Sequence, residues 1–174
     1  MNRATIITRV SLCVAMLIGA QLALGSVAGI EIVSVLLVSF SFSFGVSTSL
    51  LIATTFSLLR CLIFGSYINV ICLYLIYYNL LSLCFAHLGK RFKKQTGLKQ
   101  IAIVTALSVL FTVFFTLLDD VLTPLFYGFT KAATVSYFYA SLYTAFTHTL
   151  CVGVSVSVLF KPLTRVLLKI KVFK

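Results

Sequence analysis

The 174-residue chain is 61% hydrophobic and only 10% charged, whereas about 25% of the residues of a soluble domain are charged, so an ordinary soluble protein is excluded. The mean hydropathy of +1.15 and apolar runs of roughly 20 residues indicate an integral membrane protein, because such runs cross a bilayer as helices. The net charge of +11 raises the question of a nucleic-acid partner, but the positions of the charges favour membrane topology instead.

Twelve of the 14 basic residues gather in three segments: two lie before residue 10, five between residues 90 and 99, and five between residues 161 and 174. The three acidic residues, Glu31, Asp119 and Asp120, fall in other connections. Basic segments of membrane proteins tend to stay in the cytoplasm. We therefore expect both termini in the cytoplasm and the acidic residues on the outer side.

The apolar pattern predicts an all-α integral membrane protein, a compact bundle of six transmembrane helices that forms a single domain over residues 1–174. The second helix is short for a bilayer, so it is expected to tilt, to thin the membrane or to lean on its neighbours. The alternating serines and phenylalanines at 39–44 resemble a strand, but an open strand edge cannot be satisfied in lipid, so a helix is predicted there. The predicted helices are 5–25, 31–44, 46–64, 67–88, 98–119 and 132–160.

In the first helix, Ser11, Ala15, Gly19 and Ala23 recur at every fourth position and so form one smooth stripe. Small residues in this register let another helix approach closely in lipid, where packing drives association. The partner of the stripe is either another helix of the same bundle or a separate subunit.

Glu31 opens the second predicted helix, and Arg60 lies near the outer end of the third. An arginine at the bilayer centre costs about 2.5–3.5 kcal/mol, so Arg60 is expected to snorkel outward, to pair with an acid or to meet a ligand. Glu31 is the acid that the topology brings nearest. It either caps its own helix, where the helix dipole favours an anion, or also faces Arg60 across the mouth of a pocket.

Two stripes of aromatic and polar side chains are predicted in the outer half, one in the fourth helix and one in the sixth. Together they would wall a pocket that holds a ring system and reads its polar edges. The alternative is an interfacial aromatic belt, which fits Tyr67, Tyr127 and Tyr139. No companion metal ligand shares a face with His148, so a hydrogen-bonded neutral imidazole is expected rather than a metal site. The stripes are Tyr67, Tyr74 and Tyr78, and Tyr137, Ser141, Thr144 and His148.

Residues 119–131 are predicted to form the longest outer loop and a candidate lid, because Pro124 and Gly128 interrupt the helical pattern. Asp119 and Asp120 are adjacent, so a helix would point them apart, and they are expected at the start of this loop.

The chain contains no nucleotide-binding P-loop, no H-E-x-x-H zinc motif and no G-x-S-x-G nucleophile motif, and no buried pair of carboxylates is predicted. We therefore expect a protein that is not an enzyme and has no cofactor or metal of its own. If it drives uptake, the energy comes from another chain.

Over essentially its whole length the chain resembles the substrate-binding S components of energy-coupling factor (ECF) transporters, a class of prokaryotic ABC importers for vitamins. The likeness rests on the stripe S-x-x-x-A-x-x-x-G-x-x-x-A in the first helix, on G-I-E-I-V-S at the second, on the tight F-G turn, and on H-T-L-C-V-G through L-F-K-P-L in the last. The stripe departs from the usual A-x-x-x-A by serine at 11 and glycine at 19.

The resemblance implies a protein of a prokaryotic cell membrane that binds a vitamin from outside. The stripe Ser11, Ala15, Gly19 and Ala23 would dock on a membrane coupling subunit, which two cytoplasmic ATPases drive. The G-I-E-I-V-S segment is most similar to the cobalamin group, so cobalamin is the expected ligand. Queuosine precursors and other ring-bearing vitamins remain open, and the alternative class is an autonomous secondary transporter or channel for a hydrophobic or ring-bearing nutrient. The expected binding residues are Glu31, Arg60, Tyr67, Tyr74, Tyr78, Tyr137, Ser141, Thr144 and His148.

Overall fold

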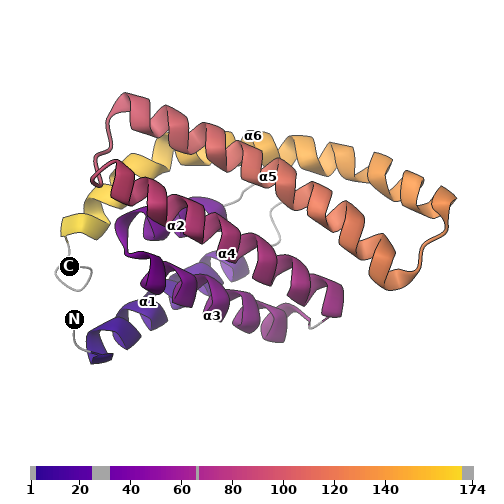
Figure 1. The fold of residues 1–174 in the computed structure, drawn as a ribbon, viewed down its shortest axis with the longest axis horizontal. Helices are drawn as coiled ribbons and strands as arrows, with labels where there is room; N and C mark the ends of the chain where they lie inside the picture. The colour runs from indigo at the N-terminus through magenta and orange to yellow at the C-terminus, as the bar shows by residue number, and fades with distance from the viewer. Residues whose placement is uncertain (1–2, 25–31, 66, 170–174) are drawn as a thin grey trace.

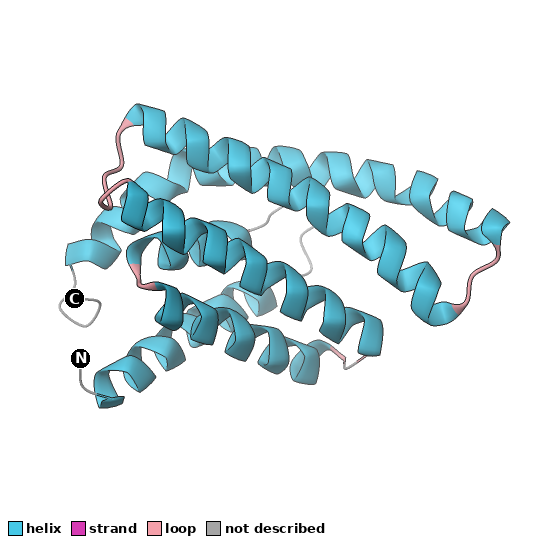
Figure 2. Cartoon of the chain, in the orientation of Figure 1, coloured by secondary structure: helices cyan, strands magenta, loops and turns pink. Residues whose placement is uncertain are grey.

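Every regular element in the described part of the chain is a helix, so the predicted all-α architecture is confirmed (Figures 1 and 2). The computed structural model describes residues 3–24, 32–65 and 67–169. The six helices follow the predicted order and differ from the predicted ranges mainly at their ends. They are α1 (Arg3–Leu24), α2 (Val33–Ser43), α3 (Val46–Phe64), α4 (Ile68–Arg91), α5 (Leu98–Tyr127) and α6 (Lys131–Lys169).

Five of these helices, all but α2, are long and apolar enough to cross a membrane. The 11 residues of α2 cover about 16 Å at 1.5 Å per residue, roughly half of the 30 Å hydrocarbon core. The expected bundle of six helices is thus present, but α2 is too short to span the bilayer as its neighbours can.

The short helix α2 lies in the interior of the bundle, where every one of its residues is buried. It packs against α1, α3, α4 and α6. Because α2 has no outward face, its serines can pair only inside the protein, and the Ser43 hydroxyl has no partner among the described residues. Ser39 Oγ donates to the Val35 carbonyl at 2.7 Å, and Ser41 Oγ donates to Ser82 Oγ of α4 at 3.1 Å. The alternating segment 39–44 is therefore helical as predicted, and burial on all sides accounts for its unusual composition.

The closest approach between helices in the core joins α4 to α2 at Gly89. A Cβ built on Gly89 would collide with the backbone carbonyl of Phe42, so only glycine fits at this position. The Phe42 ring in turn lies edge-on against Phe160 of α6, with 5.1 Å between the ring centroids. These two contacts of Phe42 therefore join α2 to both α4 and α6.

The long hairpin of α5 and α6 extends beyond the α3–α4 turn (Figure 1). The expected loop at 119–131 is wrong, because α5 continues through Pro124 to Tyr127 and leaves only residues 128–130 as a turn. Proline is tolerated inside membrane helices when neighbouring helices satisfy the freed backbone groups. The helix ends at Gly128, whose φ of 62° is left-handed and whose N–H bonds the Pro124 carbonyl. In the same way α6 continues past Pro162 to Lys169.

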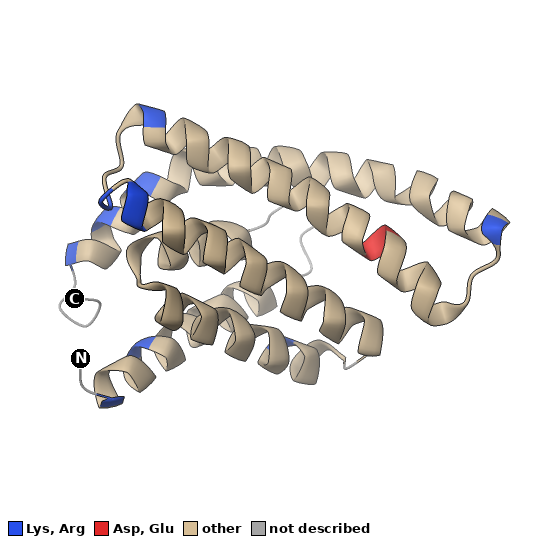
Figure 3. Cartoon of the chain, in the orientation of Figure 1, with Lys and Arg blue, Asp and Glu red and all other residues tan. Residues whose placement is uncertain are grey.

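The start of α1, the end of α6 and the α4–α5 loop lie at one end of the bundle, where most of the basic residues gather (Figure 3). The α3–α4 and α5–α6 turns lie at the other end. The two ends of the described chain therefore lie at the same end of the bundle. That this side faces the cytoplasm remains the expectation of the positive-inside rule.

The Gly89 contact predicts that Gly89→Ala destabilises the protein. Alanine would gain about 1 kcal/mol of helix propensity, but forcing a methyl group into a packed core typically costs about 1–3 kcal/mol, and here the obstacle is backbone. We expect a lower midpoint of thermal unfolding for the detergent-purified variant. Gly19→Ala, whose Cβ would meet nothing within 4 Å, is the matched control and should unfold no earlier than the parent protein.

Candidate functional site

A cluster of polar side chains joins α5 to α6 in the half of the hairpin far from the basic end. Asp119 accepts two hydrogen bonds, one on Oδ1 from the Thr123 hydroxyl and one on Oδ2 from the Tyr137 hydroxyl, both at 2.7 Å. Asp120 Oδ2 accepts a hydrogen bond from Ser141 Oγ at 2.9 Å. These five residues are called the carboxylate cluster below.

The two aspartates lie inside α5, so the expectation that they begin a loop is wrong. Adjacent helical residues do point in different directions, about 100° apart. Both nevertheless reach α6, because α6 packs along α5 and offers hydroxyls one turn apart on the same face, at Tyr137 and Ser141. The red segment in Figure 3 marks their place on α5.

A third helix reaches the carboxylate cluster through Asn69, in the first turn of α4. The buried side chain of Asn69 donates from Nδ2 to Thr123 Oγ1 at 3.2 Å. Thr123 thereby receives one hydrogen bond from α4 and donates one to Asp119. The start of α4, the end of α5 and the start of α6 are thus held together by polar contacts rather than by apolar packing alone.

One atom of the carboxylate cluster has no partner. Asp120 is only 8% exposed, and its Oδ1 makes no hydrogen bond to any described residue. The groups that do bond the two carboxylates, Thr123, Tyr137 and Ser141, are all uncharged. A buried acceptor left unsatisfied costs about 1–3 kcal/mol, and more when it is charged. This oxygen is therefore the one carboxylate oxygen of the cluster that no described residue bonds.

The depth of the carboxylate cluster follows from helix geometry. Lys99 and Asp119 are 20 residues apart on α5, and Ser141 and Lys161 are 20 residues apart on α6. At 1.5 Å per residue, each interval covers about 30 Å, which is the thickness of the hydrocarbon core. If the lysines mark one membrane boundary, the cluster lies at the other, where carboxylates are far less costly than at the centre.

Arg60 of α3 is held by aromatic rings. Its guanidinium carbon lies 3.7 Å from the centroid of the Tyr74 ring and 5.5 Å from that of Phe64. Its Nε is buried and has no hydrogen-bond partner among the described residues. Stacking on ring faces offsets part of the cost of burying the charge. The predicted partner, Glu31, lies outside the described residues.

The tyrosines of α4 pack mainly into the bundle. Tyr78 is buried in the core, Tyr74 is half-buried and stacks on Tyr78 with 5.3 Å between centroids, and Tyr67 at the helix start is 64% exposed. Tyr74 also meets Phe115 of α5 at 5.7 Å. Tyr77, which the sequence analysis did not select, lies closer to Phe115, at 4.7 Å.

The two predicted stripes are joined by α5. Phe115, which contacts Tyr74, lies one turn before Asp119, which contacts Tyr137. Contacts thus run from Arg60 through Tyr74 to Phe115, which lies one helical turn from Asp119. Of the other predicted members on α6, Thr144 is exposed and His148 is half-buried, and neither bonds another helix within the described residues.

The small-residue stripe of α1 faces away from the bundle. Ser11, Ala15, Gly19 and Ala23 are all exposed, whereas Cys13 and Leu17 of the same helix are fully buried. A Cβ on Gly19 would meet no atom within 4 Å. Two partners were considered for the stripe, a helix of the same bundle and a separate subunit. The structure therefore argues against the first of these.

No group of three or more histidine, cysteine or acidic side chains that would hold a metal ion occurs in residues 3–24, 32–65 and 67–169. Comparison with known proteins finds no family model, no curated protein and no solved structure that matches the chain. Its function therefore has to be inferred from its own residues.

The sequence analysis missed the aspartates, Thr123 and Asn69 as members of a site. A signal was present, because Asp119 and Thr123 are four residues apart, as are Tyr137 and Ser141, and both pairs share a helical face. This signal was missed because residues 119–131 were predicted to form a loop, and a four-residue spacing indicates a shared face only within a helix.

The carboxylate cluster predicts that Tyr137→Phe loosens the α5–α6 hairpin. Hydrogen bonds to charged groups contribute about 1.5–3 kcal/mol, so losing the bond to Asp119 should speed amide hydrogen exchange in the outer turns of α5 and α6. Tyr143→Phe is the control, because this tyrosine lies on the same helix and is 77% exposed. Equal exchange in both variants would show that the hydroxyl of Tyr137 does not hold the hairpin.

Proposed function

We propose that this protein is the membrane-embedded substrate-binding subunit of an ECF-type vitamin importer. The observation that carries the proposal is the exposed stripe Ser11, Ala15, Gly19 and Ala23 on α1. A stripe of small residues on the outside of a membrane bundle favours close packing with a helix of another chain. The partner is a membrane coupling subunit, driven by two cytoplasmic ATPases that supply the ATP hydrolysis.

The opposite end of the bundle supports a receptor role. The carboxylate cluster and the aromatic residues around Arg60 bring charged, polar and ring-bearing groups together near the predicted outer boundary. Such a mixture suits a ring-bearing ligand with polar edges. The ligand is a vitamin, with cobalamin as the first choice, and the protein resides in a prokaryotic cell membrane.

The docking role of the stripe is tested by Gly19→Leu. A leucine at a closely packed helix contact should cost about 1–3 kcal/mol, which corresponds to roughly five- to more than a hundredfold weaker association with the coupling subunit. Affinity-tagged protein, co-expressed with the coupling subunit and ATPases of an ECF complex, would be purified and its partners quantified. The folded state should survive, because position 19 is open.

Ala102→Leu is the control, since it places the same leucine at another exposed small residue, on α5. It should leave the association unchanged. Undiminished recovery of partners with Gly19→Leu would contradict the docking role.

The receptor role is tested with the ligand itself. Small molecules that copurify with the protein would be identified by mass spectrometry, and cyanocobalamin binding would be followed by its absorbance. We expect Asp120→Asn to weaken ligand binding about tenfold or more, because Asp120 Oδ1 is an acceptor that no described residue bonds. Asp119→Asn should instead mainly reduce stability, because both oxygens of Asp119 are already bonded within the protein. Absence of binding across a vitamin panel would overturn the receptor role.

An autonomous secondary transporter is the second candidate, and the aspartate pair within an apolar helix is the observation that favours it. Ionisable residues in membrane helices often belong to ion or substrate pathways. The candidates differ in one measurement: the purified protein alone, in sealed vesicles, should transport a nutrient if it acts autonomously and should not if it needs ATPases.

A further inference from the structure

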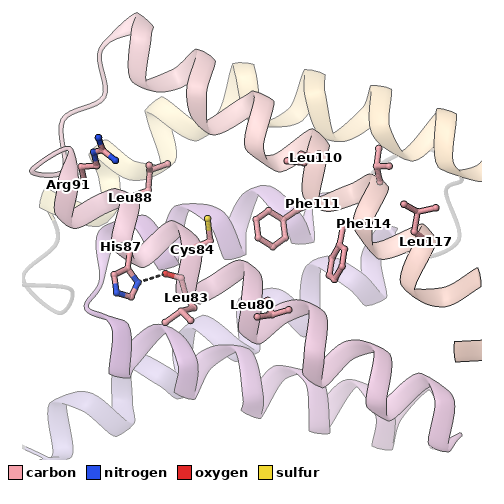
Figure 4. A pocket seen from close by; sticks show the side chains of 11 residues that line it. Leu80, Leu83, Cys84, His87, Leu88, Arg91, Leu110, Phe111, Phe114 and Leu117 are labelled. Atoms are coloured by element: carbon pink, nitrogen blue, oxygen red, sulfur yellow. Dashed lines mark hydrogen bonds between the residues drawn. The ribbon is translucent and has the colours of Figure 1, made fainter. Parts of the chain in front are cut away.

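A large apolar groove runs along the surface between α4 and α5 (Figure 4). Its volume is about 950 Å³, and its walls are mainly leucine and phenylalanine side chains. Along α4, the lining runs from Leu80 to Arg91, which is about 16 Å at 1.5 Å per residue. Across the groove, α5 contributes Leu110, Phe114 and Leu117. The groove is separate from the carboxylate cluster, since the two share no residue.

The polar side chains of the groove are at one end. Arg91 and His87 lie in the last turns of α4, and Figure 4 shows them beside Leu88 and Leu83 at the left end of the lining. His87 Nδ1 is 2.8 Å from the Leu83 carbonyl. Because a carbonyl only accepts, Nδ1 must carry a proton and donate it, which leaves Nε2 directed elsewhere. Arg91 is exposed, and its guanidinium is positively charged at any physiological pH.

Further positive charge surrounds this end. Lys90 precedes Arg91, and Lys93 and Lys94 follow it in a turn where both have positive φ, 48° and 59°. The turn is closed by hydrogen bonds from the Lys93 N–H to the Lys90 carbonyl at 3.1 Å and from the Lys94 N–H to the Gly89 carbonyl at 2.9 Å. The backbone thus holds several cations beside the polar mouth of an apolar groove.

We propose that this groove binds an anionic phospholipid, with an acyl chain between α4 and α5 and the phosphate at Arg91. A guanidinium binds phosphate oxygens through paired N–H donors, and basic sites between membrane helices on the cytoplasmic side are suited to anionic headgroups. A purely apolar occupant would use the leucines and leave the cations without a role. The proposal does not depend on the transport function, because no groove residue belongs to the stripe or to the carboxylate cluster.

The chain contains no tryptophan, so one introduced tryptophan can report on this groove alone. Phe114→Trp places the reporter on the α5 wall, and Leu62→Trp, at a site 75% exposed on α3, is the control. Each variant would be reconstituted in phosphatidylcholine vesicles that contain a fixed fraction of a lipid with brominated acyl chains, which quench tryptophan fluorescence. The brominated lipid is phosphatidylglycerol in one sample and phosphatidylcholine in the other. Quenching then measures the relative affinity of the two lipids at each site.

We expect about fivefold preference for phosphatidylglycerol at position 114 and none at position 62, since each basic residue near a membrane surface contributes about 1 kcal/mol. Arg91→Gln should reduce the preference at position 114 to less than about twofold, whereas Lys169→Gln, a matched loss of charge on α6, should leave it intact. Equal quenching by the two lipids at position 114, the same preference at both positions, or a preference that survives Arg91→Gln would each overturn the proposal.

Discussion

The complete burial of α2 is the constraint on which the rest of the structure depends. An 11-residue helix with no outward face requires neighbours on every side, and α1, α3, α4 and α6 supply them. The requirement is strictest at Phe42, where the backbone of α2 approaches α4 so closely that only Gly89 fits. With these helices committed to α2, α5 makes its main contacts with α4 and α6.

The position of α5 explains why distinct chemistry lies on its different sides. The side of α5 that faces α6 carries the two aspartates of the carboxylate cluster. The side that faces α4 carries Phe115, which contacts Tyr74, the ring on which Arg60 stacks. On another side, α5 provides one wall of the apolar groove, and α4 provides the other. The stripe on α1 lies on a helix with no strong contact to α5, so a partner at the stripe would not compete directly for these sites.

The sequence predicted most of the fold because hydrophobic period and helix-ending residues are local signals. The predicted helix at 46–64 coincides with α3, which begins after Gly45 and ends before Gly65. The predicted end of α5 was wrong because proline acts as a breaker in water, whereas the buried Pro124 lies within a continuous helix. The α6 helix likewise continues through the exposed Pro162 to Lys169.

The site was harder to predict, because its geometry depends on which helices are neighbours. Spacing correctly grouped Tyr137 with Ser141, but it could not show that their partners would be Asp119 and Asp120. Likewise, the stripe on α1 could be recognised as a surface for close packing, but whether it faced inward or outward depended on tertiary structure. Tyr78 illustrates the same limit, because its hydroxyl-bearing ring suited a pocket wall and lies in the core instead.

The enclosure of α2 also has a consequence for biogenesis. A segment of this length is a weak candidate for independent insertion as a spanning helix, since recognition of a span depends on about 20 apolar residues. Its cover includes α6, which follows α2 to α5 in the chain and is therefore made after them. The serines and phenylalanines of α2 are thus fully shielded only after α6 has been made and has packed against them.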